Sequence, residues 1–294
     1  MSYTDRSGDV IDQRYELCER LGAGATGAVY RATDAASGGQ SVAVKILGRH
    51  FARDPEMRAR FEREARALNG LSHPNLIRFS DFGLDAGCPY LVTELLVGAD
   101  LRARLAAAPI APTVALTLAT GVLEGLAYAH ANGVLHRDIK PSNVFVKEGA
   151  EGGLQPKLID FGLARFFDRD RWGHQSTLTE DGTVLGTPTY MSPEQGFGSR
   201  VDARTDVYAA GTLLFELFAG RPPFVSKSSA MLIRAHALEE PPKLAEVRPG
   251  AVVDAALQAL LDRALAKRPE DRFDDGAALL RELHTVEPPG IRYA

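Results

Sequence analysis

The sequence predicts an α+β protein of two unequal lobes, a small β-rich lobe with one helix and a larger, mainly α-helical lobe. Two observations carry this prediction. Apolar residues alternate as in strands up to about residue 96, and beyond residue 98 they recur at helical spacing. Of the 294 residues, 45% are hydrophobic and 24% are charged, which suits a globular chain that buries an apolar core in each lobe.

The small lobe is predicted to cover residues 15–96, after a flexible lead-in at residues 1–14 that shows little periodicity. One helix interrupts its strands. The start of this helix is well marked, because Asp54 can act as N-cap and Pro55 suits the first helical position. Gly70 suits the C-terminal cap. The expected strands cover residues 21–31, 41–47, 76–82 and 90–95.

The large lobe is predicted over residues 97–284, and residues 285–294 form a tail. Residues 207–219 are apolar on nearly every side, so we expect a buried central helix there. Residues 163–193 lack periodicity and carry Gly, Thr, Asp and Arg, which indicates an irregular loop, either functional or disordered. The expected helices cover residues 113–131, 206–219, 227–238, 254–266 and 275–284.

The net charge and the cysteines bound the environment of the chain. A formal charge of −4 gives no broad attraction to nucleic acid or to an anionic membrane, so we expect neither partner. Cys18 and Cys88 suggest neither a disulfide framework nor a metal pair, which favours a reducing compartment. No apolar stretch approaches the roughly 20 residues of a membrane span, and the start lacks a signal-peptide core. We therefore expect a cytoplasmic protein without a membrane span.

A glycine-rich segment near the start of the small lobe is a candidate phosphate-binding loop. Gly22, Gly24 and Gly27 stand where backbone could approach a phosphate without a Cβ in the way. The chain continues from there as a strand and not as a helix. This favours a hairpin that lies over the ligand, and it disfavours a dinucleotide-binding turn. An ordinary glycine-rich β-turn would show the same pattern.

Lys45 and Glu64 are predicted to form a pair inside the small lobe. Strand alternation places Ala43, Lys45 and Leu47 on one face. Glu64 falls within the inward stripe of the helix, and a carboxylate facing a core needs a partner. Lys45 is the obvious one, although a lysine that protects an edge strand from aggregation is the alternative. The stripe consists of Met57, Phe61, Ala65 and Leu68.

Two polar segments of the large lobe could carry chemistry. The run from His136 to Asn143 supplies a possible base in Asp138, a cation in the preceding Arg137 and an amide five residues beyond Asp138. Asp160, the first residue of Asp-Phe-Gly, follows a strand-like segment, and a carboxylate at the end of a strand is a frequent ligand of a hard cation. Each short motif arises often by chance, so their order and spacing carry the weight.

In that order, the motifs resemble the eukaryotic-type Ser/Thr protein kinases of bacteria, over about residues 15–284. The resemblance implies the bilobal protein-kinase fold, with ATP and Mg²⁺ (or Mn²⁺) as cofactors. It further implies transfer of the γ-phosphoryl group to Ser or Thr hydroxyls of protein substrates.

The same resemblance assigns roles to single residues. Asp138 would accept the proton of the substrate hydroxyl, and Lys140, typical of the Ser/Thr class, would steady the transferred phosphoryl group. Lys45 would hold the α- and β-phosphates with Glu64 orienting it. The metal ligands would be Asn143 and Asp160.

The resemblance also implies an ATP site. Val29, Ala43 and Phe145 would enclose the adenine, the backbone of Glu94 and Leu96 would hydrogen-bond it, and Thr93 stands at the gatekeeper position. A small gatekeeper predicts an open back pocket, although an ordinary strand threonine looks identical. The glycine loop would supply the remaining contacts, from Leu21, Gly22, Ala23, Gly24, Ala25, Thr26, Gly27, Ala28 and Val29.

Control is expected at the loop that follows Asp160. Arg137 would receive a phosphothreonine there, and we expect autophosphorylation, with self-association where it occurs in trans. A well-solvated hydroxyl-rich loop is the alternative. The candidate acceptors are Thr177, Thr179 and Thr183.

Two further contacts are implied by the resemblance in the large lobe. Glu194 would pair with Arg272, and Asp206 would accept backbone hydrogen bonds from the turn at His136 and Arg137. An ordinary surface charge is the alternative at each of the two sites. Ser192 stands where alanine is commoner in the family.

Two rival functions remain open at this point. A pseudokinase scaffold generally lacks one of the residues that Lys45, Asp138 and Asp160 represent, and all three are present. A small-molecule phosphotransferase of related fold fits Lys140 and the segment around Ser192 less well than a protein kinase does. If the chain is a fragment of a longer receptor-type kinase, its expected place is the inner face of the membrane.

Overall fold

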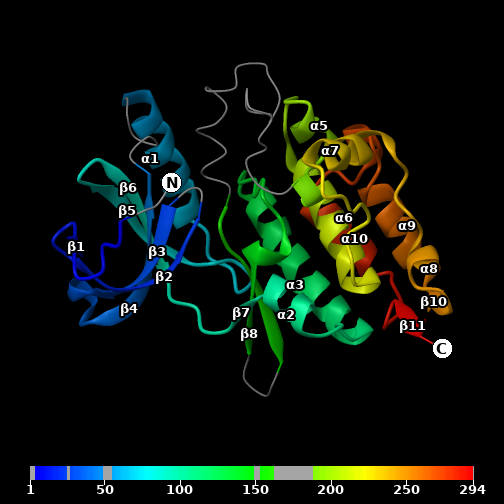
Figure 1. The fold of residues 1–294 in the computed structure, drawn as a ribbon, viewed down its shortest axis with the longest axis horizontal. Coiled ribbons are helices and arrows are strands. Elements are labelled where there is room, and N and C mark those ends of the chain that lie inside the picture. Colours follow the sequence, from blue (N-terminus) through cyan, green and yellow to red (C-terminus); the bar gives the residue numbers. More distant parts are fainter. Residues whose placement is uncertain (1–3, 25–26, 49–54, 149–152, 162–187, 294) are drawn as a thin grey trace. The chain divides into compact units, whose positions relative to one another are not determined.

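The computed structural model describes residues 4–24, 27–48, 55–148, 153–161 and 188–293. The chain divides into two compact units, and the division falls between Val97 and Gly98. The smaller unit runs from blue to cyan in Figure 1, and the larger one from green to red. The fold class predicted from the sequence is confirmed, since the first unit is a sheet with one helix and the second is mainly helical.

The small unit is built on an antiparallel sheet with the strand order β1-β2-β3-β4-β6-β5. Helix α1 (Pro55–Asn69) packs on β5, where the rings of Phe61 and Phe82 meet edge to face at 6.2 Å between centroids. The strands are β1 (Val10–Ile11), β2 (Tyr15–Ala23), β3 (Gly27–Asp34), β4 (Gln40–Leu47), β5 (Phe79–Asp85) and β6 (Cys88–Glu94).

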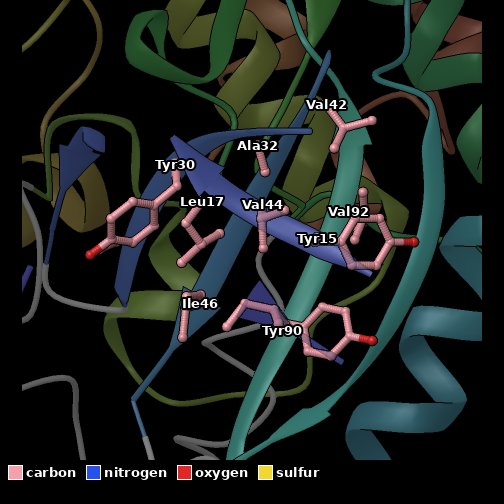
Figure 2. Close-up of a cluster of buried hydrophobic side chains, with 11 residues drawn as sticks. Tyr15, Leu17, Tyr30, Ala32, Val42, Val44, Ile46, Tyr90 and Val92 are labelled. Carbon is pink, nitrogen blue, oxygen red and sulfur yellow. The ribbon is translucent and has the colours of Figure 1, made fainter. Parts of the chain in front are cut away.

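Strand alternation builds the core of the small unit. Val42, Val44 and Ile46 on β4 point into one apolar cluster, while Ala43 and Lys45 between them are half-buried. Figure 2 shows the cluster, in which side chains from neighbouring strands interdigitate. It comprises Ile11, Tyr15, Leu17, Ala28, Tyr30, Ala32, Val42, Val44, Ile46, Tyr90 and Val92.

The glycine-rich segment 21–31, expected as one strand, is divided between two. It holds the end of β2 and the start of β3, which form a hairpin with Ala23 opposite Ala28. Gly27 has a packing reason for being glycine, because a Cβ there would lie 2.1 Å from the carbonyl oxygen of Ile46 on β4. At Gly22 and Gly24 a Cβ would meet nothing within 4 Å, so packing does not require glycine at these two positions.

Other boundaries of the small unit also differ from expectation. The strand expected at 76–82 runs from Phe79 to Asp85, and α1 begins at Pro55 as predicted, while Asp54 lies outside the described residues. Where a flexible lead-in was expected, residues 10–11 form β1 and Ile11 is fully buried. A two-residue strand is too short to show periodicity in the sequence.

The large unit surrounds helix α6 (Ala203–Ala219), which begins after Asp202 as N-cap and ends at Gly220 in the left-handed conformation. Nearly all its residues are buried, which confirms the predicted central helix. Helices α3, α9 and α10 pack against it. The helices are α2 (Leu101–Ala107), α3 (Pro112–Ala131), α5 (Pro193–Gly196), α6, α7 (Ser229–Leu238), α8 (Leu244–Val247), α9 (Ala255–Ala264) and α10 (Gly276–Leu283).

Short elements complete the large unit. One small sheet has the order β7-β8-β9, and another pairs β10 with β11. Of these strands, β11 lies inside the segment 285–294 that was expected to be a tail. The 3₁₀ turns include η3 (Pro141–Asn143), η5 (Pro188–Tyr190) and η6 (Pro269–Asp271). The strands are β7 (Ala99–Asp100), β8 (Val144–Glu148), β9 (Leu154–Leu158), β10 (Ala251–Val253) and β11 (Ile291–Tyr293).

Helix α3 is, within the described part of the chain, the helix long and apolar enough to cross a membrane by length and composition. Half of its most apolar window is buried against protein, and it packs on α6, α10 and β9. A core helix has this composition for the same reason that a membrane span does, because both must avoid water.

Candidate active site

Asp138 lies in the loop that joins α3 to η3 and β8, and two neighbours orient its carboxylate. Lys140 Nζ lies 2.7 Å from Asp138 Oδ2, and Asn143 Nδ2 donates to the same oxygen at 2.9 Å. Asn143 Nδ2 also donates to the main-chain carbonyl of Asp138 at 2.8 Å. A carboxylate fixed in this way, with an ammonium group beside it, can accept a proton next to a site of concentrated negative charge.

Asp206 anchors this loop from the start of α6. Its carboxylate accepts the backbone N–H of His136 at 2.7 Å and of Arg137 at 2.6 Å, as the resemblance implied. His130 Nε2 lies 3.0 Å from Asp206 Oδ2. Because His130 Nδ1 accepts the N–H of Gly276, its proton is on Nε2, which donates to Asp206. Burial raises the pKa of Asp206, but these donors outweigh it and hold the pKa below its usual value.

The backbone of Arg137 is left-handed, with φ of 64°. A non-glycine residue in this region costs on the order of 1–3 kcal/mol and persists only where its surroundings hold it. Asp206 supplies one restraint at the Arg137 N–H. The strain lies one residue before Asp138, so the structure commits stability to the placement of that carboxylate.

His136 connects the Asp138 loop to the segment that carries Asp160. Its Nε2 lies 3.0 Å from the carbonyl of Ile159, and its ring packs beside Phe161 at 4.6 Å between centroids. His136 is fully buried, and this burial lowers its pKa, so the ring is neutral near neutral pH. Ile159 also donates its N–H to the carbonyl of Asn143 at 2.9 Å.

Asn143 and Asp160 suit a hard cation by their chemistry. The amide nitrogen of Asn143 is engaged by Asp138, which leaves its oxygen as the ligand atom, and Asp160 offers a carboxylate. Across the described residues, no three His, Cys, Asp or Glu side chains gather as a protein-only metal site would need. A cation here would thus take its remaining ligands from phosphate and water, as Mg²⁺ commonly does.

Helix α5 is tied to the large unit by Glu194 and Arg272. The pair is bidentate at 2.8 and 2.9 Å, and the arginine is fully buried. The remaining guanidinium donors reach the carbonyls of Ala266, Lys267 and Arg204. This contact, implied by the resemblance, is confirmed. Burial raises the pKa of Glu194, but Arg272 brings it below the usual value.

Sequence reasoning missed the hydrogen bonds of Ser192 and Gln195. They form a capping box at the start of α5, and the amide of Gln195 also donates to the carbonyl of Arg137 at 3.1 Å. The pattern Ser-Pro-Glu-Gln is a capping-box signature that could have revealed the first of these contacts. The second joins residues 58 positions apart, which no local pattern records.

The expected phosphate- and adenine-binding residues are divided between the units. In the small unit Lys45 on β4 stands opposite Val29 on β3, and Ala43 stands opposite Thr93 on β6. Thr93 Oγ1 donates to the carbonyl of Glu94 at 3.3 Å. Phe145 lies on β8 in the large unit, opposite Lys157. The remaining expected contacts in the small unit are Leu21, Gly22, Ala23, Gly24, Gly27, Ala28 and Leu96.

Several expectations are left untested. Lys45 and Glu64 are both half-buried in the small unit, on β4 and α1, and their ion pair stays a prediction. Ala25 and Thr26 of the glycine loop lie outside the described residues, as do the three candidate phosphorylation sites Thr177, Thr179 and Thr183.

Comparison with known proteins places the chain in a family. Residues 15–282 match the family model described as protein kinase domain. The chain is 39% identical over 278 residues to serine/threonine-protein kinase Pkn1 of Myxococcus xanthus, covering 95% of this chain and 39% of that protein. Against serine/threonine-protein kinase PknB of Mycobacterium leprae the identity is 36%, covering 95% and 44%. The chain thus spans about two fifths of these relatives.

A solved structure agrees with the sequence matches. The crystal structure of the PknI kinase domain of Mycobacterium tuberculosis superposes with a TM-score of 0.73 at 30% identity, covering 96% of this chain and 99% of that one. Members of the family use ATP and a divalent metal ion. The chain therefore belongs to the protein kinase family and is a kinase domain of the bacterial serine/threonine type.

Proposed function

We propose that the protein transfers the γ-phosphoryl group of Mg·ATP to Ser or Thr hydroxyls of protein substrates in bacterial signalling. The observation that carries this proposal is the Asp138 carboxylate, held by Lys140 at 2.7 Å and by Asn143 at 2.9 Å on a loop anchored to buried Asp206. A scaffold protein without chemistry has no need to orient a carboxylate and a lysine in this way.

The reaction that follows from these groups is an in-line transfer. The substrate hydroxyl oxygen forms a bond to the γ-phosphorus, the bond from that phosphorus to the β,γ-bridging oxygen breaks, and Asp138 takes the hydroxyl proton. The ammonium group of Lys140 offsets charge on the transferred phosphoryl group, which passes through a loose, charge-rich transition state. A cation held by Asn143 and Asp160 would supply further countercharge. We favour Mg²⁺ over Mn²⁺, because Mg²⁺ prefers few protein ligands together with phosphate oxygens.

Replacement of the base tests the proposal. Asp138→Asn keeps the size of the side chain and one acceptor oxygen for Lys140 and Asn143, but it cannot accept the proton. Turnover with labelled ATP and a generic basic protein should therefore fall about 10²–10⁴-fold. Asp262→Asn is the matched control, since Asp262 lies on helix α9, outside the Asp138 loop, and forms an exposed ion pair with Lys243. Equal activity in Asp138→Asn and wild type would contradict the assigned role. If wild-type protein transferred no label to any acceptor, the result would favour a scaffold. If it labelled an aminoglycoside but no protein, the result would favour a small-molecule phosphotransferase.

We further propose activation by autophosphorylation at Thr177, Thr179 or Thr183, in trans between two copies of the chain. Arg137, which precedes Asp138, supports this proposal, because its fixed positive charge suits it to bind the phosphate group of a phosphothreonine. Mass spectrometry of wild type and Asp138→Asn should find phosphate on at least one of the three threonines in wild type only. Fully active protein with unmodified threonines would refute this. Mixing active protein with an inactive, larger-tagged copy distinguishes trans from cis transfer.

The proposed location is the cytoplasm, or the inner face of the membrane where the chain belongs to a longer receptor-type kinase. Cys18 and Cys88 form no disulfide, and a chain with only two unpaired cysteines suits a reducing compartment. Cell fractionation with an antibody against this domain would test the location, and recovery of the domain outside the inner membrane barrier would contradict it.

A further inference from the structure

The side chain of Gln195 connects helix α5 to the loop between α3 and η3 that carries Arg137 and Asp138, which we call the catalytic loop. Its Oε1 accepts the N–H of Ser192 at 3.1 Å and lies 3.4 Å from the Ser192 hydroxyl, which closes the capping box. Its Nε2 donates to the carbonyl oxygen of Arg137 at 3.1 Å. One amide group therefore fixes the start of α5 and a residue of the catalytic loop at the same time.

The chemistry at both ends decides which way this amide points. A backbone N–H can bond only to the amide oxygen, and a backbone carbonyl only to the amide NH₂. A flipped amide would place two donors together at Ser192 and two acceptors together at Arg137. The donor at the Arg137 carbonyl is thus required by its surroundings.

The carbonyl that Gln195 contacts belongs to the peptide unit joining Arg137 to Asp138. Arg137 is held left-handed, with φ of 64°, and its N–H is bound by the buried carboxylate of Asp206 at 2.6 Å. Asp206 restrains the peptide unit before Arg137, and Gln195 restrains the one after it. Rotation of this second unit moves the Cα of Asp138, because peptide units are rigid planes linked at Cα atoms.

We propose that Gln195 is a positioning residue for phosphoryl transfer, whose amide donor fixes the Arg137–Asp138 peptide and so the placement of the Asp138 carboxylate. This inference rests on the proposed function. Gln195 does not reach the reacting atoms in this account. It acts through the backbone, and it makes the placement of α5 and of Asp138 depend on each other, since α5 is itself anchored by Glu194 and Arg272.

The variant Gln195→Glu removes the hydrogen-bond donor to the Arg137 carbonyl while it keeps the capping box with Ser192. Glutamate is a standard capping-box residue, so its oxygen can still accept the Ser192 N–H, but an ionised carboxylate has no hydrogen to give to the Arg137 carbonyl. We expect kcat to fall about tenfold, a barrier increase of about 1.4 kcal/mol. The KM for ATP should stay within about twofold, since a group acting on Asp138 alone affects the transition state and leaves nucleotide binding unchanged.

The pH dependence of this variant provides a sharper readout. A carboxyl group held against a carbonyl oxygen has a raised pKa, because only its protonated form can donate a hydrogen bond there. The ratio of the wild-type kcat to the Gln195→Glu kcat should therefore fall toward 1 as the pH falls from 8 to 5.5. Gln195→Met fills similar space without a donor at any pH, so its ratio to wild type should stay constant over the same range.

Gln155→Glu is the control for added charge. Gln155 lies on β9 opposite Lys147, away from α5, and the same change there should leave kcat near the wild-type value. Hydrogen–deuterium exchange of the peptide that contains His136 to Asp138 gives a readout independent of activity. We expect faster exchange in Gln195→Glu and unchanged exchange in Gln155→Glu.

The outcomes separate this inference from the proposed function. Inactive wild-type protein would contradict the function, and the exchange experiment would still decide whether Gln195 restrains the loop. Active wild type with Gln195→Glu equal to it in kcat and in exchange would overturn this inference alone. Gln195→Met with the kcat of wild type would also overturn it, because that variant lacks the donor to the Arg137 carbonyl at every pH.

Discussion

Each unit of the molecule holds an arginine against carboxylates, in different surroundings. In the small unit Arg14 contacts Asp34 with two nitrogens at 2.7 and 2.8 Å and Asp81 with a third at 2.9 Å, and 36% of its side chain is exposed. In the large unit Arg272 contacts Glu194 at 2.8 and 2.9 Å, and its side chain is fully buried. The bond lengths are alike, so solvent access is the main difference.

The Arg14 contacts belong to a set that fastens the N-terminal residues to the sheet. Arg6 Nη2 lies 2.9 Å from Asp85 on β5, and the Tyr90 hydroxyl donates to Asp12 at 2.8 Å. Arg14 holds the pKa of Asp34 well below its usual value, against the opposing effect of burial. Water still reaches the arginines of this set and Asp81, which is 32% exposed, and competes with their contacts, so these contacts order the segment at modest energetic gain.

The Arg272 pair lies where water cannot compete. Taking two charges out of water is costly, and every donor of this guanidinium is matched by an acceptor that offsets the cost. Removal of one partner leaves a buried charge without compensation, whereas removal of both does not. The comparison teaches that identical hydrogen-bond geometry has unequal consequences when one arginine is wet and the other is dry.

The largest effect is expected from Arg272→Met. The variant leaves the buried Glu194 carboxylate without its cation, so the free energy of unfolding should fall by about 3–5 kcal/mol. Urea denaturation followed by circular dichroism measures it. The double variant Arg272→Met with Glu194→Leu should recover part of the loss. A single variant as stable as wild type would show that the buried pair is not needed.

A second prediction concerns the buried imidazole of His236, which lies on α7 and contacts Tyr208 on α6. His236 on α7 is 1% exposed and bonds to the Tyr208 hydroxyl at 2.9 Å. Burial, with the nearby Lys267 cation, lowers its pKa from 6.5 to about 4. Between these values the unfolded chain binds a proton at His236 that the folded protein does not, so stability rises with pH there. Acidification from pH 7 to pH 5 should cost about 2 kcal/mol from this group.

His236→Asn tests this prediction. Asparagine keeps an acceptor near the Nδ1 position but does not titrate, so its unfolding free energy should fall less than that of wild type between pH 7 and pH 5. His136, whose pKa is also lowered by burial, leaves part of the pH dependence in both proteins. Parallel pH profiles for wild type and variant would show that His236 titrates at its ordinary value.

The smallest effect is expected from Arg14→Gln in the small unit. The variant should lower the thermal midpoint of unfolding by less than Arg272→Met does. Solvent already reaches Arg14 and Asp81, which are 36% and 32% exposed, and buried Asp34 keeps the hydrogen bonds from Ala36 N–H and the Ser37 hydroxyl. Sodium chloride at high concentration should shrink the difference from wild type, because exposed charge pairs are screened and buried ones are not. A salt-independent loss, or one larger than that of Arg272→Met, would reverse the order argued from exposure.

Much of the candidate site could be predicted from the sequence, because its parts lie close together along the chain. Asp138, Lys140 and Asn143 span six positions and do lie within hydrogen-bond reach of one another. The central helix followed from apolar residues on all its faces, and the start of α1 from a proline at its first position. Two contacts distant in sequence, Glu194 with Arg272 and Asp206 with His136, came only from the family resemblance.

Tertiary structure alone decided the rest. The sequence determined the main helices and most strands of the sheet, but not the short strands β1 and β11, and it determined the order of the candidate catalytic groups. Periodicity and short spacing are properties of neighbouring residues, and a strand of two or three residues is too short to show them. It did not show that Gln195 reaches Arg137, 58 positions away, or that Arg6 reaches Asp85, 79 positions away. A polar side chain carries the same chemistry whichever partner it meets, and only the packed chain determines which partner lies within 3 Å.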